Sequence, residues 1–121
     1  MDVDLIARLR WAMAALEAKK AFHILALDVS AKTSIADVFM FCSVGSQRQA
    51  QAVSDEVLRV LRAEGAKPLS VEGYSQGTWV LLDYGDFVLH VFDEERREYY
   101  SLDRLWGDAP AITERLSPTS P

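Results

Sequence analysis

Cysteine and histidine are almost absent from this sequence, which has one cysteine and two histidines among its 121 residues. A single cysteine cannot form a disulfide within the chain. Because Cys42 lies inside an apolar run, we expect a buried thiol and a reducing compartment. His23 and His90 stand alone, without the ligand spacing of a zinc site, so no metal is expected.

Long apolar runs are also missing. No stretch approaches the roughly 20 apolar residues that a membrane-spanning helix needs. The chain begins Met-Asp-Val-Asp, with acids where a targeting signal carries bases. We therefore expect a soluble, cytoplasmic protein without a membrane partner.

Basic character is the third absence. The formal net charge is −5, from 13 basic and 18 acidic residues, and no basic stripe is visible along the sequence. Proteins that bind nucleic acids mainly through phosphates usually have a net basic domain or such a stripe. The sequence favours a basic protein or a small molecule as partner, and no sequence-specific nucleic acid.

Nucleotide-binding motifs are lacking as well, and no cofactor is expected, because neither a P-loop nor Gly-x-Gly-x-x-Gly occurs. Gly45-Ser46, at a predicted strand-to-helix junction, resembles the pair that opens the active site of nucleotidyltransferases. That chemistry also needs two or three carboxylates on a nearby strand to hold magnesium, and the next predicted strand offers only Glu72. We favour a turn and a helix cap without catalytic residues. A nucleotidyltransferase-like enzyme remains the alternative.

What is present predicts a single α/β domain, since half of the residues are hydrophobic. Apolar residues recur with helical spacing over residues 4–20. They do so again over residues 46–64, a segment that begins with a capping box. Short apolar or alternating runs predict strands at residues 24–29, 38–42, 69–71, 78–84 and 87–92. This order predicts a mixed, mostly five-stranded sheet with flanking helices, a parallel crossover around residues 46–64 and a final antiparallel pair. The domain spans residues 1–107, and residues 108–121 form a tail that is disordered at its end.

The last two strands are separated only by Gly85-Asp86, which indicates a tight hairpin. Residues that pair across such a hairpin share a face. One face is apolar and is assigned to the core; it carries Val80, Leu82, Tyr84, Phe87, Leu89 and Val91. The other, here called the mixed face, resembles an interface core unless a helix covers it; it carries Trp79, Leu81, Asp83, Val88, His90 and Phe92. We expect Asp83 and His90 to form a hydrogen-bond pair that orients the histidine.

A charged segment at residues 93–98 precedes a group of aromatic and leucine residues, namely Tyr99, Tyr100, Leu102, Leu105 and Trp106. This is more apolar surface than a short terminal segment usually buries, and Tyr, Trp and Arg are enriched in binding hot spots. We therefore expect a surface that binds another macromolecule between residues 71 and 107.

Several separated motifs give this sequence a family likeness over roughly residues 5–106. They are residues 33–39 (TSIADVF), 45–49 (GSQRQ), 72–73 (EG), 79–86 (WVLLDYGD), 88–92 (VLHVF) and 97–106 (REYYSLDRLW). In this order and spacing they resemble the ribosomal silencing factor family, also called RsfS or Iojap. Ser101 and Asp103 depart from the aspartate and glutamate expected in the last motif.

The resemblance implies a fold related to nucleotidyltransferases but without their catalytic acids. It also implies a translational repressor that binds the large ribosomal subunit through ribosomal protein L-fourteen and blocks joining of the small subunit, lowering translation when nutrients are scarce. Carried over by position, the partner-binding residues are Trp79, Leu81, Asp83 and His90, with Arg97, Tyr100, Leu102 and Trp106 nearby. Isolated members of this family tend to form homodimers, so we expect a homodimer when the chain is free. A basic ribosomal protein suits a chain of charge −5.

Overall fold

Five strands form one mixed sheet in the computed structural model, which describes residues 1–117 without the side chains of residues 99, 100, 102 and 103. The strands are β1 (Phe22–Asp28), β2 (Val38–Val44), β3 (Ser70–Glu72), β4 (Trp79–Asp83) and β5 (Phe87–Asp93). Their spatial order is β1-β2-β5-β4-β3, with β2 and β5 parallel and the other neighbours antiparallel. The predicted fold class is confirmed.

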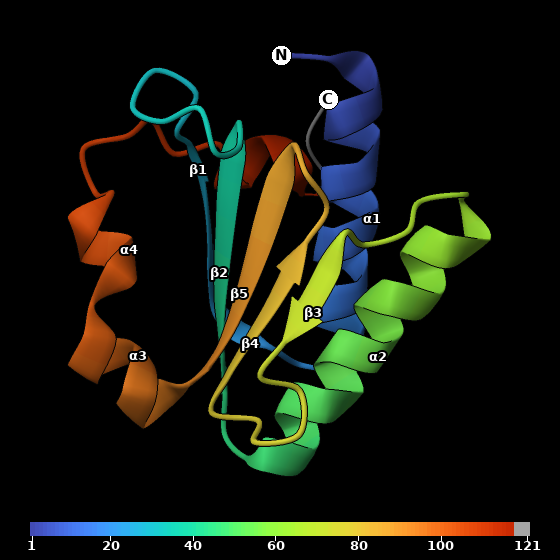
Figure 1. Ribbon diagram of the computed structural model, residues 1–121, viewed down its shortest axis with the longest axis vertical. Coiled ribbons are helices and arrows are strands. Elements are labelled where there is room, and N and C mark those ends of the chain that lie inside the picture. Colours follow the sequence, from blue (N-terminus) through green and yellow to red (C-terminus); the bar gives the residue numbers. More distant parts are fainter. Residues whose placement is uncertain (118–121) are drawn as a thin grey trace.

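Two long helices, α1 (Val3–Ala18) and α2 (Gln47–Ala63), cover one face of the sheet (Figure 1). The Ser46 hydroxyl caps α2 by accepting a hydrogen bond from the backbone N of Gln49 at 3.0 Å, as the sequence predicted. Gly65 ends the helix with φ of +87°, a conformation that favours glycine. Strand β3 runs parallel to β2, as expected for strands joined by a crossover, although β5 and β4 lie between them.

The main core lies between the sheet and these two helices. Alternate residues of β2 point into it, among them Met40 and Cys42, together with Leu82 of β4 and Leu89 of β5. All four are completely buried. Burial raises the pKa of the Cys42 thiol to about 12, so this cysteine is a core residue, as predicted.

The opposite side of the sheet carries α3 (Glu94–Tyr100) and α4 (Leu102–Leu105) (Figure 1). The chain then returns along the edge of β1, where Ala111 pairs with Leu27 and the short helix η1 (Thr113–Leu116) follows. Ile112 and Leu116 are buried in the main core. Residues 108–117, expected to be a tail, are therefore part of the folded unit, whereas residues 118–121 lie outside the described residues.

None of the helices within residues 1–117 combines the length and the apolarity that a bilayer crossing requires.

Candidate functional site

The β4–β5 hairpin has the register that the sequence predicted. Trp79 pairs with Phe92, Leu81 with His90, and Asp83 with Val88. Since paired residues share a face, the mixed face forms as expected. The apolar residues on the other side of the hairpin are buried against the main core.

An aromatic cluster extends the mixed face onto β2 and the segment after α4. Its members are Phe39, Phe41, Trp79, His90, Phe92 and Trp106. The rings of Phe41 and His90 stack with their centroids 4.9 Å apart, and those of Trp79 and Phe92 with theirs 5.2 Å apart. Trp106 meets Phe39 edge-on at 5.2 Å. These geometries are favourable for aromatic pairs, so the cluster is a rigid platform.

His90 is oriented by Trp79, and the expected Asp83–His90 hydrogen bond is wrong. Nε1 of Trp79 donates to Nδ1 of His90 at 3.2 Å, whereas the Asp83 carboxylate accepts from the backbone N of Gly85 at 2.8 Å. Asp83 pairs with Val88, two residues along β5 from His90, and completes the hairpin turn instead. An indole N–H can only donate, so the neutral imidazole carries its proton on Nε2. Burial lowers the pKa of His90 to about 4, which keeps the ring neutral near pH 7.

The mixed face is covered at its centre and open toward β3. Val88, His90 and Phe92 are buried, whereas Trp79, Leu81 and Asp83 are half-buried. Beyond them β3 is exposed along its whole length, and Ser70 and Glu72 continue the mixed face because they pair with Asp83 and Leu81. The accessible part of the site is therefore an apolar strip with carboxylates beside it.

Arg97 anchors α3 to the sheet. Its side chain is buried, and Nη1 donates to the backbone O of His23 and, at 2.8 Å, to the Ser43 hydroxyl. The Glu94 carboxylate lies 3.1 Å from Nδ1 of the exposed His23. Hydrogen bonds from Ser43 and then from His23 lower the pKa of Glu94 below its usual value. These contacts give Arg97 a structural role at the site.

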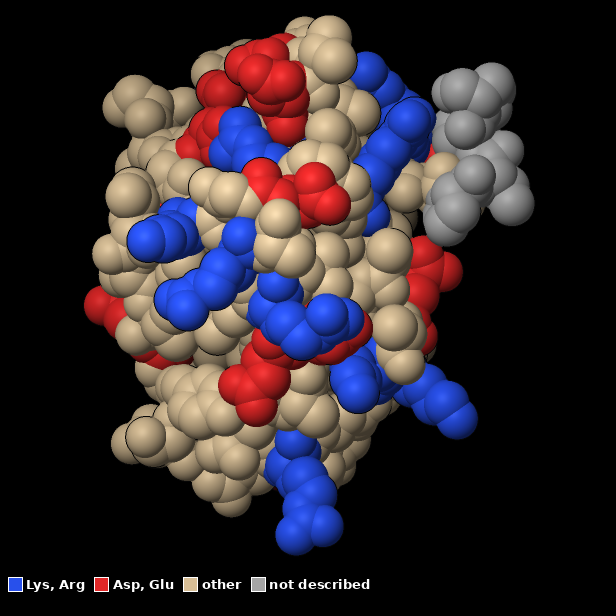
Figure 2. Space-filling view, turned by 90° about the vertical axis from the view of Figure 1, so that its right-hand side faces the viewer, with Lys and Arg blue, Asp and Glu red and all other residues tan. Residues whose placement is uncertain are grey.

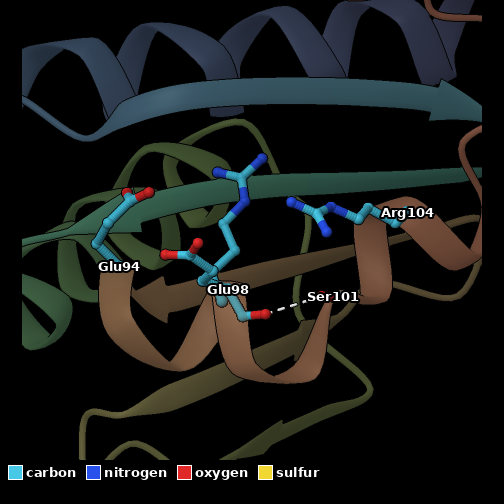
Figure 3. A pocket seen from close by; sticks show the side chains of 5 residues that line it. Glu94, Glu98, Ser101 and Arg104 are labelled. Atoms are coloured by element: carbon cyan, nitrogen blue, oxygen red, sulfur yellow. Dashed lines mark hydrogen bonds between the residues drawn. The ribbon is translucent and has the colours of Figure 1, made fainter.

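A polar pocket of about 240 Å³ lies between α3 and α4, lined by Glu94, Arg97, Glu98, Ser101 and Arg104 (Figure 3). Ser101 separates the two helices with φ of +52°, and its hydroxyl donates to the backbone O of Glu98 at 2.8 Å. Leu105 on α4 is 70% exposed, so this segment adds apolar surface beside the mixed face. Two predicted site residues, Tyr100 and Leu102, lie outside the residues whose side chains are described.

Several side chains of the site were missing from the sequence prediction. Phe39, Phe41 and Ser43 of β2 face this side of the sheet, but the sequence predicted only a strand at residues 38–42. Glu72 of β3 and Glu94 of α3 add carboxylates to its rim. The available signal was the spacing of Phe39, Phe41 and Ser43, because residues two apart on a strand share a face.

Negative charge concentrates in the stretch of chain that forms most of this face. Residues 70–104 hold eight acids and three bases, a net charge of −5, and the remaining residues hold ten of each. The whole formal charge of the chain therefore lies in the stretch from β3 to α4. A surface of this kind attracts a basic partner and steers its approach.

The polar groups of the Gly45-Ser46 turn form hydrogen bonds with other residues of the protein. Ser46 caps α2, and the Gln49 side chain accepts from the backbone N of Gly45 at 2.7 Å. The loop before β4 packs on this helix end so tightly that a Cβ on Gly77 would lie 2.6 Å from Cγ of Gln47. Within the described residues, no group of three or more His, Cys, Asp or Glu side chains could hold a metal ion.

Comparison with known proteins identifies close relatives. The sequence model of the family described as "Ribosomal silencing factor during starvation" matches residues 3–121. Ribosomal silencing factor RsfS of Halalkalibacterium halodurans is 42% identical over 104 residues, which cover 86% of this chain and 89% of the relative. A crystal structure from Chromobacterium violaceum has a TM-score of 0.81 and 36% identity, covering 88% of each chain. The mouse protein named "Mitochondrial assembly of ribosomal large subunit protein 1" is 26% identical over 108 residues, 87% of this chain and 45% of that protein.

Proposed function

The chain belongs to the ribosomal silencing factor family, and we propose that it lowers translation by binding the large ribosomal subunit and blocking the joining of the small subunit. The name of the mouse relative points to the large subunit. The proposed contact is ribosomal protein L-fourteen, and the proposed place of action is the cytoplasm.

The observation that carries this proposal is the half-open mixed face, formed largely by the acidic stretch of residues 70–104. Trp79 and Leu81 offer apolar area that the fold leaves partly uncovered, and Asp83 and Glu72 stand beside them. Interfaces commonly combine such an aromatic anchor with a polar rim. Ribosomal proteins that pack on RNA are basic, so carboxylates at the rim complement them.

Burial divides the proposed binding residues into two groups. Trp79, Leu81 and Asp83 are accessible enough to touch a partner. His90 and Arg97 are buried, so we assign them to positioning: His90 accepts the indole hydrogen bond of Trp79, and Arg97 fixes α3. Trp106 packs on Phe39 and holds the segment after α4 against the aromatic cluster. Tyr100 and Leu102 remain proposed partner-binding residues.

The proposed mechanism is steric exclusion. A 13.6 kDa domain seated where the subunits meet occupies surface that the small subunit needs. Its effect follows mass action, because a binder shifts an equilibrium only by its own differential affinity. The repressor therefore captures free large subunits and does not pull joined ribosomes apart.

Cosedimentation with separated ribosomal subunits tests the proposal. The protein is expected to move with the large subunit and not with the small one, and excess purified L-fourteen is expected to release it. Leu81→Ala should weaken this binding. Leu69→Ala is the matched control, because Leu69 is 75% exposed and lies just before β3, next to the Gly85 turn. Equal binding to both subunits, or equal loss in both variants, would contradict the proposed surface.

A further inference from the structure

Six basic side chains that are scattered along the sequence gather on one face of the molecule. Figure 2 shows Lys and Arg spread over the side formed by the two long helices, with Asp and Glu between them. We define the basic strip as the exposed residues at the end of α1, along α2 and in the connection to β3, namely Lys19, Lys20, Arg48, Arg59, Arg62 and Lys67. The fold thus creates a basic surface on a protein of net charge −5.

Most of this positive charge is available to a partner. Within the described residues, Arg59 is the member of the strip that forms an ion pair, with Glu56 at 2.8 Å. Of the nearby acids, Asp55 already accepts a hydrogen bond from the Tyr74 hydroxyl at 3.0 Å. Residues 19–20 and 47–67 together hold six bases and three acids, a net charge of +3, so the rest of the chain carries −8.

The strip also has a shape suited to an extended chain. Arg48 and Arg62 lie 14 residues apart on α2, which places them about 21 Å apart along the helix axis. Between α2 and β3 runs an open groove of about 480 Å³ lined by Asp55, Leu58, Arg59, Arg62, Pro68 and Val71. Arg59 and Arg62 therefore line a groove together with three apolar residues and one acid.

We propose that the basic strip binds the phosphate backbone of ribosomal RNA while the mixed face binds its protein partner. This inference rests on the proposed function, because the large subunit supplies RNA beside protein. Lysine and arginine side chains bind phosphates without reading sequence. The expectation of no sequence-specific nucleic-acid contact is therefore unaffected.

Strand β3 places the two surfaces next to each other. Val71 lines the groove on the helical side, whereas its neighbours Ser70 and Glu72 continue the mixed face. A ribosome that touches the mixed face through a protein can thus reach the strip around a single edge strand.

Because the molecule as a whole is negatively charged, the basic strip should bind RNA effectively only after the mixed face has docked. The −8 on the rest of the chain repels RNA, so the strip alone binds free RNA weakly. Once the mixed face is docked, the strip meets nearby phosphates at a high effective concentration, and a weak contact then adds to the overall affinity. The same charge distribution orients the molecule, with its acidic side toward the basic protein and its basic side toward RNA.

The test compares two double variants that remove the same charge. Arg62→Gln with Lys67→Gln removes two bases of the strip that form no ion pair within the described structure. Lys32→Gln with Arg115→Gln removes two bases elsewhere, on the loop after β1 and on η1, and also breaks the surface ion pair of Lys32 with Asp108. Binding to intact large subunits is measured over a series of salt concentrations, and binding to purified L-fourteen is measured beside it.

The strip variant is expected to bind large subunits about tenfold more weakly at moderate salt, with the slope of log affinity against log salt reduced by about two. Its binding to purified L-fourteen is expected to be unchanged, and the control variant should match the wild type in both assays. An unchanged salt slope in the strip variant overturns the proposal. Weakened binding to L-fourteen alone assigns the strip to a protein contact and also overturns it. Failure of the wild type to bind large subunits refutes the proposed function instead.

Discussion

Replacing Trp79 by alanine should abolish most of the ribosome binding while leaving the fold intact. A fully buried tryptophan costs about 3–5 kcal/mol when truncated, and Trp79 is only half-buried. We expect Trp79→Ala to lower the free energy of unfolding by about 2–3 kcal/mol. This figure includes the lost ring contact with Phe92 and the lost hydrogen bond to His90. A domain of this length is stable by roughly 6–18 kcal/mol, so the variant remains folded.

Trp79→Ala should change the affinity for the large subunit much more visibly than it changes the folded fraction. An aromatic anchor at the centre of an interface contributes about 2 kcal/mol or more on truncation, which is about 30-fold in affinity. The aromatic cluster behind Trp79 cannot replace it, because Phe92 and His90 are buried. Cosedimentation with large subunits measures the affinity, and urea unfolding measures the stability of the same preparation.

Trp11→Ala provides the matched control. Trp11 is also partly buried, but it lies on α1 and packs against the main core on the opposite side of the sheet. It should lose similar stability and keep its affinity. If Trp79→Ala binds as well as the wild type, the mixed face is not the binding surface. If it fails to fold, Trp79 is a core residue and the division between anchor and positioning residues is wrong.

Four further results are expected. The free energy of unfolding should fall as the pH is lowered from 6.5 to 4. In this range the unfolded chain protonates His90, whereas the folded chain does not, because burial lowers the pKa of His90 to about 4. The loss at pH 5 is about 2 kcal/mol, and His90→Phe should show a flatter pH profile in urea unfolding. The free protein should form a concentration-dependent homodimer through the mixed face, so light scattering should report a monomer for Trp79→Ala at concentrations where the wild type dimerises. The protein added to large subunits before small ones should lower the joined fraction in sucrose gradients, and should do much less when added to joined ribosomes; immediate loss in both orders would require active splitting. Calorimetry with a magnesium nucleotide should show no heat, and saturable binding would favour the nucleotidyltransferase-like alternative.

Local sequence signals were sufficient for much of the fold. The Gly85-Asp86 turn and the alternation beside it set the hairpin register, which in turn defines the mixed face. Ser46 and Gly65 marked the start and the end of α2 through backbone chemistry that depends on a few neighbouring residues. Such signals are readable because both partners of each contact lie close together in the chain.

Side-chain partners could not all be predicted in this way, whether they lie near or far in the chain. Asp83 has Gly85 two residues away as a competing donor, and Trp79 reaches His90 across the hairpin, so the expected aspartate–histidine pair does not form. Arg97 looked like a surface residue in a charged segment, but β1 and β2 supply it with buried acceptors. The basic strip could not be predicted from the sequence, because its residues come from α1, α2 and the following connection.

The position of His90 explains how one face serves both the fold and a partner. Its ring is buried against Phe41, and its Nδ1 accepts the indole hydrogen bond that fixes Trp79. A side chain fixed before binding loses less conformational entropy when the complex forms, which favours affinity. Removing the histidine should therefore weaken binding through Trp79, because the proposed role of His90 is to position the indole. His90→Phe keeps the stacking and removes the acceptor, so it should reduce affinity less than Trp79→Ala does, and combined with Trp79→Phe it should have little additional effect on affinity. A full additive loss in that double variant would show that His90 contacts the partner directly.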